Sequence, residues 1–234
     1  MYRLSQKLLA EFIGTFTLVF IAAGSICAGQ YARVAGQPIA GPPLGYALAY
    51  GLAAAVMVSA LGHISGGHLN PAITISFWVT KRMGTIQTLL YGAVQLLGAA
   101  AAAYLLSSVV PEPVWRAVAL GATDLTPDFT RMHGMLLEGL MTFFLVFVYF
   151  ACAVDARGMF HKAAGFAVGL SITMDVLVGQ PFTGASMNPA RTFGPALAAH
   201  HWVNHGVYWV GPLLGGVLAG VIYDRFFLRG QATA

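Results

Sequence analysis

The sequence contains the triplet Asn-Pro-Ala twice, at Asn70-Pro71-Ala72 and at Asn188-Pro189-Ala190. Asparagine is a favoured N-cap residue, and proline is favoured at the first helical position, where no backbone N–H is needed. Each triplet therefore predicts the start of a helix. One such triplet would indicate an ordinary capped helix, but two copies, each preceded by a glycine-containing loop, indicate a paired site.

The chemistry available at such a pair is electrostatic. The N-terminus of a helix carries roughly half a positive charge, so two of them facing one space repel cations and hydronium but not neutral polar molecules. The carboxamides of Asn70 and Asn188 can donate hydrogen bonds to a passing oxygen atom. A water molecule held by both donors would relay protons poorly along a file of waters. Arg191, directly after the second triplet, adds a permanent positive charge.

The elements that must hold this site lie in a very apolar chain. Of its 234 residues, 58% are hydrophobic and 9% are charged, and the mean hydropathy is +0.73. Soluble domains carry roughly 25% charged residues, so this composition favours a lipid bilayer as the solvent. The net charge of +4 comes from basic residues scattered outside the apolar runs, not from a basic stripe with interleaved aromatics. We therefore expect no nucleic-acid partner.

Six apolar runs are long enough, with their flanks, to cross a bilayer as helices of about 20 residues. They are Leu8–Ala28, Gly45–Leu61, Ile86–Leu106, Met135–Ala153, Ala163–Val178 and Val207–Phe227. We expect the first run to be a permanent helix rather than a cleaved signal. The segments 70–79 and 188–199 are too short to cross, and we expect re-entrant half-helices there.

Six crossings put both termini on one side of the membrane, and the basic residues favour the cytoplasm for that side. The basic residues expected there are Arg3, Lys7, Lys81, Arg82, Arg157, Lys162, Arg225 and Arg229. Those expected on the other side are Arg33, Arg116, Arg131 and Arg191. We interpret the chain as a multi-pass protein of the cell (inner) membrane with cytoplasmic termini.

The two halves of this single domain, 1–234, repeat each other over about 5–106 and 132–228. Glu11 and Glu138 each lie four residues before a threonine and nine before a phenylalanine. Each glutamate is followed, 59 and 50 residues on, by one of the two asparagines. Three crossings per repeat make the halves insert in opposite senses, so the two half-helix starts should meet near the midplane.

With these two motifs in an inverted repeat, the sequence resembles the aquaporin (major intrinsic protein) family over about Leu8 to Phe227. The resemblance implies an all-α membrane fold, an hourglass of six tilted transmembrane helices and two re-entrant half-helices. It also implies one pore per subunit, a homotetramer in the lipid bilayer, and passive passage of water and small neutral solutes. It implies neither catalysis nor a cofactor.

The family's aromatic/arginine filter can be placed by spacing. Arg191 matches its arginine. Tyr50, twenty residues before the first asparagine, matches the position on the second helix. Val176 and Ala185, twelve and three residues before the second asparagine, match the fifth-helix and loop positions.

This filter departs from that of strict water channels, in which the residue at the fifth-helix position is typically histidine. The small side chains of Val176 and Ala185 predict a wider neck with one apolar wall and one arginine wall. The pattern resembles the filter of the nodulin-26-like channels of plants and their bacterial relatives. That resemblance implies glycerol, urea-like molecules or neutral metalloid acids such as arsenite as solutes. Thr192, Ala196 and Trp209 keep features closer to water channels. The filter arginine is not followed by the aspartate of glycerol facilitators, which disfavours a dedicated glycerol channel.

Carboxylates in the apolar runs need partners, because an unpaired charge in a membrane is costly. By resemblance, Glu11 and Glu138 accept hydrogen bonds from the backbone of the re-entrant loops, and their role is scaffolding; a proton relay is the alternative. Asp175, next to Val176, could make a helix–helix hydrogen bond or support the filter loop.

Two histidines flank the first loop. We expect His63 to orient that loop or to line the cytoplasmic vestibule. A metal site with His68 is the alternative, but no complete zinc ligand set is present in the sequence, so we expect no metal.

The leading hypothesis is a passive channel for water and somewhat larger neutral solutes. Within the channel class, a metalloid-selective or polyol-selective pore with poor water flow and a strict water channel are the alternatives. From another class, the alternative is an ion-coupled secondary transporter or an intramembrane enzyme, for which the membrane acids Glu11, Glu138 and Asp175 are the motivation.

Overall fold

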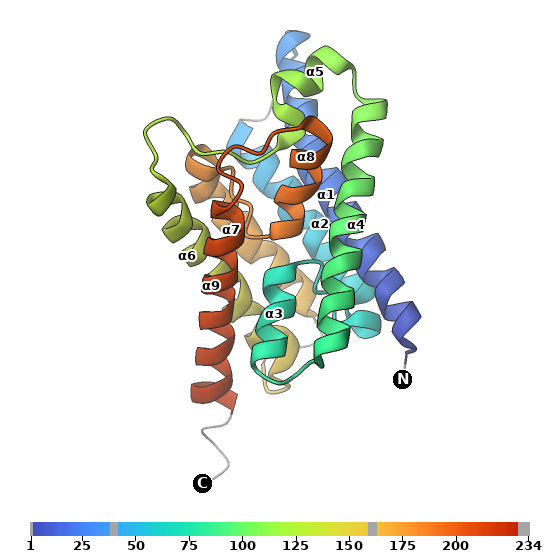
Figure 1. The fold of residues 1–234 in the computed structure, drawn as a ribbon, viewed down its shortest axis with the longest axis vertical. Helices are drawn as coiled ribbons and strands as arrows, with labels where there is room; N and C mark the ends of the chain where they lie inside the picture. The colour runs from blue at the N-terminus through green and yellow to red at the C-terminus, as the bar shows by residue number, and fades with distance from the viewer. Residues whose placement is uncertain (1, 38–41, 159–162, 229–234) are drawn as a thin grey trace.

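The computed structural model describes residues 2–37, 42–158 and 163–228, and six long helices dominate these ranges (Figure 1). The long helices are α1 (Leu4–Val34), α2 (Pro42–Ser65), α4 (Thr85–Val109), α6 (Arg131–Tyr149), α7 (Ala164–Thr183) and α9 (Val207–Ile222). The short helices are α3 (Pro71–Val79), α5 (Glu112–Ala117) and α8 (Pro189–Ala199). A 3-10 turn, η1 (Ala119–Gly121), follows α5, and the π-helical turns η2 (Phe150–Val154) and η4 (Tyr223–Leu228) extend α6 and α9.

The spanning helices, with the π-helical extensions of α6 and α9 counted, are longer than the apolar runs of the sequence. Helix α1 continues to Val34 and stops where Gly36 takes a left-handed φ of 65°. Helix α7 continues through Pro181 to Thr183 and ends at Gly184, which has a φ of 77°. Backbone stop signals, rather than the last apolar residue, set these ends. Each of the six segments, counting the π-helical extensions, is long and apolar enough to cross a membrane.

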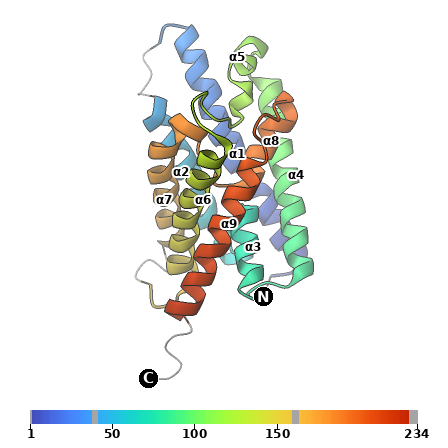
Figure 2. The same ribbon diagram turned by 60° about the vertical axis from the view of Figure 1, so that its left-hand side comes forward.

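The half-helices α3 and α8 lie inside the bundle, one in each half of its length, and their N-termini face the middle (Figures 1 and 2). The chain termini lie at one end of the bundle, and α5 lies at the other. Helix α2 packs along α7, α1 along α4 and α6 along α9. This is the inverted repeat of six helices and two half-helices expected from the sequence, and the predicted fold class is confirmed.

Glycines allow the closest of these helix contacts. A Cβ added at Gly215 of α9 would lie 1.9 Å from the carbonyl oxygen of Gly139 on α6. A Cβ added at Gly169 of α7 would lie 2.4 Å from the carbonyl oxygen of Gly51 on α2. Such close backbone approach is typical of helix packing in membranes, where small residues replace the hydrophobic effect as the means of association.

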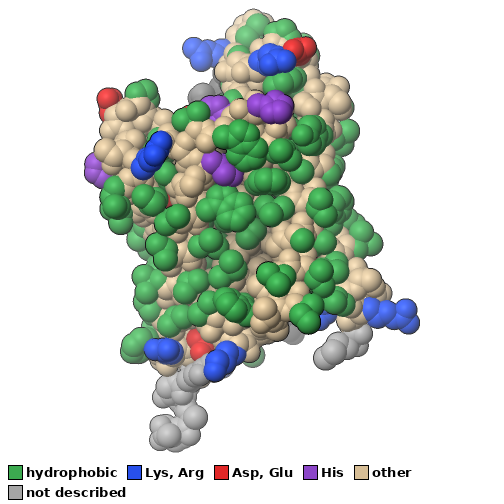
Figure 3. All heavy atoms as spheres, in the orientation of Figure 1, with side chains coloured by type: hydrophobic (Ala, Val, Ile, Leu, Met, Phe, Trp, Pro, Cys, Tyr) green, Lys and Arg blue, Asp and Glu red, His purple; other side chains and the backbone are tan. Residues whose placement is uncertain are grey.

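On the face shown in Figure 3, apolar side chains cover the middle of the molecule, and lysines and arginines lie toward the two ends. On α2 the large hydrophobic side chains that are exposed form a stripe with a spacing of four: Leu44, Leu48, Leu52 and Val56. This surface fits lipid, and the chain is a multi-pass membrane protein. Of the basic residues assigned to a side by the sequence, Lys162 and Arg229 lie outside the described residues.

Candidate functional site

Each asparagine of the two triplets caps its half-helix. The Oδ1 atom of Asn70 accepts a hydrogen bond from the backbone N–H of Ala72 at 2.8 Å. The Oδ1 atom of Asn188 accepts one from Ala190 at 2.9 Å. Both asparagines have extended backbone angles, as N-cap residues do, and a proline follows each of them as the first helical residue.

The two asparagines also join the halves of the chain. The Nδ2 atom of Asn70 donates to the carbonyl oxygen of Met187, and that of Asn188 donates to the carbonyl oxygen of Leu69, each at 2.9 Å. Leu69 and Met187 have left-handed φ values of 52° and 53°. This backbone conformation turns the carbonyl of each residue toward the asparagine of the other half of the chain. The N-termini of α3 and α8 are thus held against each other. Each NH2 group has two hydrogens, so one donation to a carbonyl leaves the second for another acceptor.

Glu11 holds the first re-entrant loop. It is fully buried, and its two carboxyl oxygens accept hydrogen bonds from two backbone N–H groups and two side chains. The donors are the backbone N–H of His68 (2.9 Å) and Leu69 (2.7 Å), the Ser65 hydroxyl (2.7 Å) and the Gln95 amide (2.8 Å). Both oxygens accept, which suits a carboxylate that scaffolds the loop.

Glu138 holds the second loop in the same way. It accepts hydrogen bonds from the backbone N–H of Ser186 (2.9 Å) and Met187 (2.7 Å) and from the Thr183 hydroxyl (2.7 Å). Thr183 stands five residues before its asparagine, as Ser65 does in the first half. The two sites therefore match residue by residue, apart from the additional amide donor on Glu11.

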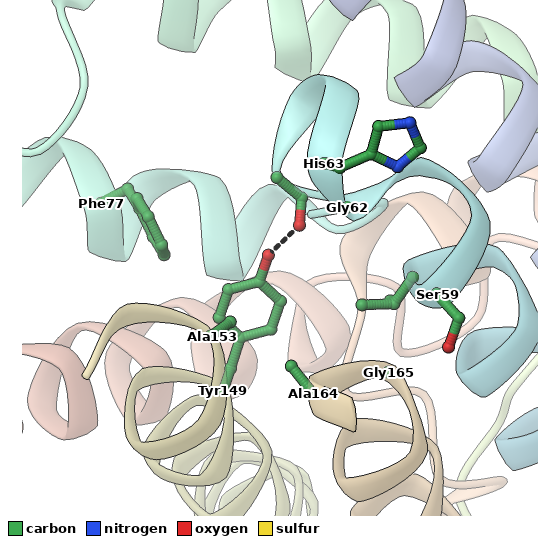
Figure 4. Close-up of a pocket in the computed structure, with 10 residues that line it drawn as sticks. Ser59, Gly62, His63, Phe77, Tyr149, Ala153, Ala164 and Gly165 are labelled. Atoms are coloured by element: carbon green, nitrogen blue, oxygen red, sulfur yellow. Dashed lines mark hydrogen bonds between the residues drawn. The ribbon is translucent and has the colours of Figure 1, made fainter. Parts of the chain in front are cut away.

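Two tyrosine hydroxyls each donate to a loop carbonyl of the opposite repeat. Tyr50 of α2 donates to the carbonyl oxygen of Ser186 at 2.8 Å. Tyr149 of α6 donates to the carbonyl oxygen of Gly66, the contact dashed in Figure 4. Together with the asparagine amides, these bonds tie each loop to the other half of the chain.

A cavity of about 380 Å³ lies on the side of the chain termini, next to Tyr149 (Figure 4). Its lining residues are Val58, Ser59, Gly62, His63, Gly66, Phe77, Tyr149, Ala153, Ala164 and Gly165. His63 lies at the C-terminal end of α2, and its ring packs edge-on against Tyr2, with 5.8 Å between the centroids. His63 is thus one of the residues that line this cavity, and its expected role, orienting the loop or lining a vestibule, stays a prediction.

The four filter positions are all buried, with at most 3% of each residue exposed. Tyr50, Val176 and Ala185 belong to one buried cluster. Arg191 donates from one terminal nitrogen to the carbonyl oxygen of Gly121 at 2.7 Å. Its Nε atom is buried and has no hydrogen-bond partner among the described residues.

Asp175 is buried next to Val176, with 3% of the residue exposed. Its Oδ2 atom has no hydrogen-bond partner within the described part of the chain. Both roles expected for Asp175, a helix–helix hydrogen bond and support of the filter loop, stay predictions.

A family model described as Major intrinsic protein matches residues 1–223. The chain belongs to the major intrinsic protein family.

Members of this family are membrane channels, and the relatives found share most of this chain's length. Aquaporin TIP4-4 of Zea mays is 45% identical over 225 residues, which cover 95% of this chain and 87% of the relative. Aquaporin-4 of Mus musculus is 38% identical over 218 residues, covering 93% of this chain and 66% of the relative. Among solved structures, the aquaglyceroporin from Plasmodium falciparum superposes with a TM-score of 0.81. That match covers 97% of this chain and 98% of the other at 22% identity, so it shows the common major intrinsic protein fold alone.

Sequence reasoning missed several residues that position the site. Ser65 and Thr183 could have been found, because they stand at the same offset in both repeats. Gln95, Tyr149 and Gly121 carry no such signal, since each reaches the site only through the packing of distant segments.

Proposed function

We propose that this chain is a passive channel for water and small uncharged solutes that excludes protons and ions. The observation that carries the proposal is the pair of half-helix N-termini joined by Asn70 and Asn188. Two positive helix ends at one place oppose cations, and the remaining amide hydrogens orient a neutral molecule that accepts hydrogen bonds. The names of the relatives, which are aquaporins, support water as one substrate.

The filter supports a wider range of solutes. We propose that Tyr50, Val176, Ala185 and Arg191 form the neck of the pore, with an apolar wall opposite the guanidinium. Such a neck suits molecules with both apolar and hydroxyl faces: glycerol, urea-like molecules or neutral metalloid acids such as arsenite. The resemblance of this pattern to nodulin-26-like channels is part of the same proposal.

A strict water channel is the second candidate. The hydroxyl of Tyr50, which donates to the carbonyl of Ser186, favours it. This hydrogen bond fixes the ring of Tyr50 in the buried cluster that also contains Val176 and Ala185, and a fixed ring there would narrow the proposed neck. Glu11 and Glu138 give no support to a transporter driven by an ion gradient, because both oxygens of each are occupied as acceptors for the loops.

We also propose a homotetramer in the cell (inner) membrane with both termini in the cytoplasm. The support is the family membership and the basic residues at the end of the bundle that carries the termini. Cysteine labelling from either side of the membrane, at Arg3→Cys and at Arg116→Cys, would show which end faces the cytoplasm.

Swelling of proteoliposomes separates these functions. Purified protein is reconstituted, and volume change is followed by stopped-flow light scattering in gradients of sucrose (for water), glycerol, urea and arsenite. The proposal expects water flux plus flux of at least one larger solute, in both directions and without an ion gradient. Water flux alone would establish the strict water channel, and flux that requires an ion gradient would refute a channel.

A double variant tests whether Val176 and Ala185 line the neck. Val176→His together with Ala185→Thr adds bulk to the wall facing Arg191, so solute flux should fall about tenfold or more while water flux is retained, since a steric pocket discriminates by this order per added group. Leu177→Phe, on an exposed side chain of the same helix, is the matched control. Unchanged solute flux in the double variant would show that these residues do not line the neck.

A further inference from the structure

Four consecutive residues, 121–124, which we call the strap, cross the end of the bundle that is remote from the termini. The chain enters the strap through three left-handed residues, Ala119 (φ 44°), Leu120 (φ 54°) and Gly121 (φ 73°). Such angles are costly outside glycine and persist only where the surroundings hold them. Leu120 supplies that hold, because it is fully buried in a cluster with Ala23 and other apolar residues.

The inner side of the strap contacts the proposed filter. The carbonyl oxygen of Gly121 accepts the hydrogen bond of Arg191 at 2.7 Å. The hydroxyl of Thr123 shares a hydrogen bond of 2.9 Å with that of Thr192, the residue after the arginine. Thr192 is in turn 2.5 Å from the hydroxyl of Ser186 in the second loop. The strap therefore touches the arginine, its half-helix and, through one side chain, the loop.

The outer side of the strap is held by Asp124. One of its carboxyl oxygens accepts from the Asn204 amide at 2.9 Å, and the other lies 3.0 Å from Nε2 of His201. Asn204 also accepts a hydrogen bond from Nε of Arg131, at the start of α6, at 3.0 Å. About a third of the Asp124 side chain and a quarter of the His201 side chain are exposed. This outer cluster joins the strap to the loop after α8 and to α6.

We propose that Asp124 and His201 are positioning residues that set the place of Arg191 in the pore through the strap. The inference rests on the proposed role of Arg191 in the neck. Because the Nε atom of Arg191 has no partner in the described part of the chain, the contact with Gly121 is the means by which the strap orients the guanidinium. Releasing Asp124 lets the strap and that carbonyl move, and the guanidinium then leaves its place.

Movement of the guanidinium should change the selectivity between glycerol and water more than it changes the water flux. A guanidinium that is no longer held leaves the neck wider on average, and passage of a three-carbon polyol depends more on that width than passage of water does. We expect Asp124→Ala to raise the glycerol-to-water permeability ratio about twofold to fivefold, as suits removal of a part-exposed charged contact. Water permeability per protein should stay within about twofold by the same reasoning.

The experiment measures both permeabilities of the full-length protein in proteoliposomes at equal protein density. Asp124→Asn keeps an oxygen for Asn204 and an amide for His201, so it should restore the wild-type ratio. Glu112→Ala removes an exposed ion pair with Arg116 at the same end of the molecule, and this control should not change the ratio. His201→Ala removes one contact from an exposed loop and should raise the ratio less than Asp124→Ala; it also serves if Asp124→Ala does not fold.

Arg191→Ala separates the two hypotheses. If it leaves the ratio unchanged, the proposed filter itself is wrong. If it raises the ratio while Asp124→Ala and His201→Ala do not, the filter stands and the strap proposal is overturned. A parallel fall of water and glycerol flux in the Asp124 and His201 variants, at constant ratio, would also overturn it, because it would show a merely structural role.

Discussion

Replacement of the two loop-holding glutamates should destabilise the protein in an order set by their hydrogen bonds. Glu11 accepts four hydrogen bonds and Glu138 accepts three. Each buried donor left without an acceptor costs about 1–3 kcal/mol. Glu138→Ala should therefore cost about 3–9 kcal/mol and Glu11→Ala about 4–12 kcal/mol.

The glutamine variants give a finer comparison, because an amide has one accepting oxygen instead of two. On Glu138, one oxygen serves Thr183 and Ser186 and the other serves Met187 alone. Glu138→Gln can keep two bonds and lose one, at about 1–3 kcal/mol. On Glu11 each oxygen serves two donors, so Glu11→Gln loses two bonds and costs about 2–6 kcal/mol.

The assay is thermal unfolding of the purified protein in detergent, followed by circular dichroism, together with water permeability in proteoliposomes. A change of 1 kcal/mol shifts the melting temperature of a protein of this size by roughly 2–4 °C. Glu11→Gln should therefore melt at least about 2 °C below Glu138→Gln. Asp128→Ala, at an exposed acid, is the control and should melt like the wild type. Equal or reversed melting of the two glutamine variants would refute the assignment of these residues as loop scaffolds.

Three further outcomes test separate parts of the structure. Gly215→Ala should lower the melting temperature, because its Cβ would lie 1.9 Å from a carbonyl of α6, whereas Gly92→Ala, with nothing within 4 Å of the added Cβ, should not. Hydrogen bonds from Arg157 hold the pKa of Asp155 below its usual range, so this pair stabilises the fold at neutral pH and the stabilisation is lost as the pH falls below about 4. Melting of Asp155→Asn should accordingly change less between pH 7 and pH 3 than melting of the wild type. Asn188→Asp replaces an amide donor by a negative oxygen at the meeting point of the half-helices, so cation conductance should become measurable in planar bilayers while wild-type protein stays silent.

Much of this fold could be predicted from the sequence, because the strongest signals in it are local. The asparagine and proline of each triplet are a cap and a first helical residue whatever surrounds them, and α3 and α8 begin there. The apolar runs likewise predict directly which segments cross the membrane and face lipid. Helix ends were harder to predict, since α1 and α7 run past their apolar residues until a glycine with positive φ stops them.

The contacts that shape the site could be predicted only in part. The paired glutamates were visible through the internal repeat. The outer parts were not, because Gly121 reaches Arg191 across 70 positions of the chain and Tyr50 reaches Ser186 across 136. Every residue has a carbonyl acceptor, so the identity of Gly121 or Ser186 does not predict that its carbonyl accepts a hydrogen bond from a distant side chain.

The reciprocal bonds between the two loops have a consequence for biosynthesis. Asn70 finds its acceptor at Met187, and Tyr149 of the second repeat finds its acceptor at Gly66 of the first. A nascent chain that has inserted only its first three crossings thus holds an incomplete pore, with donors and carbonyls at the midplane that await residues not yet synthesised. We therefore expect the two loops to reach their final arrangement only after both halves of the chain have been inserted.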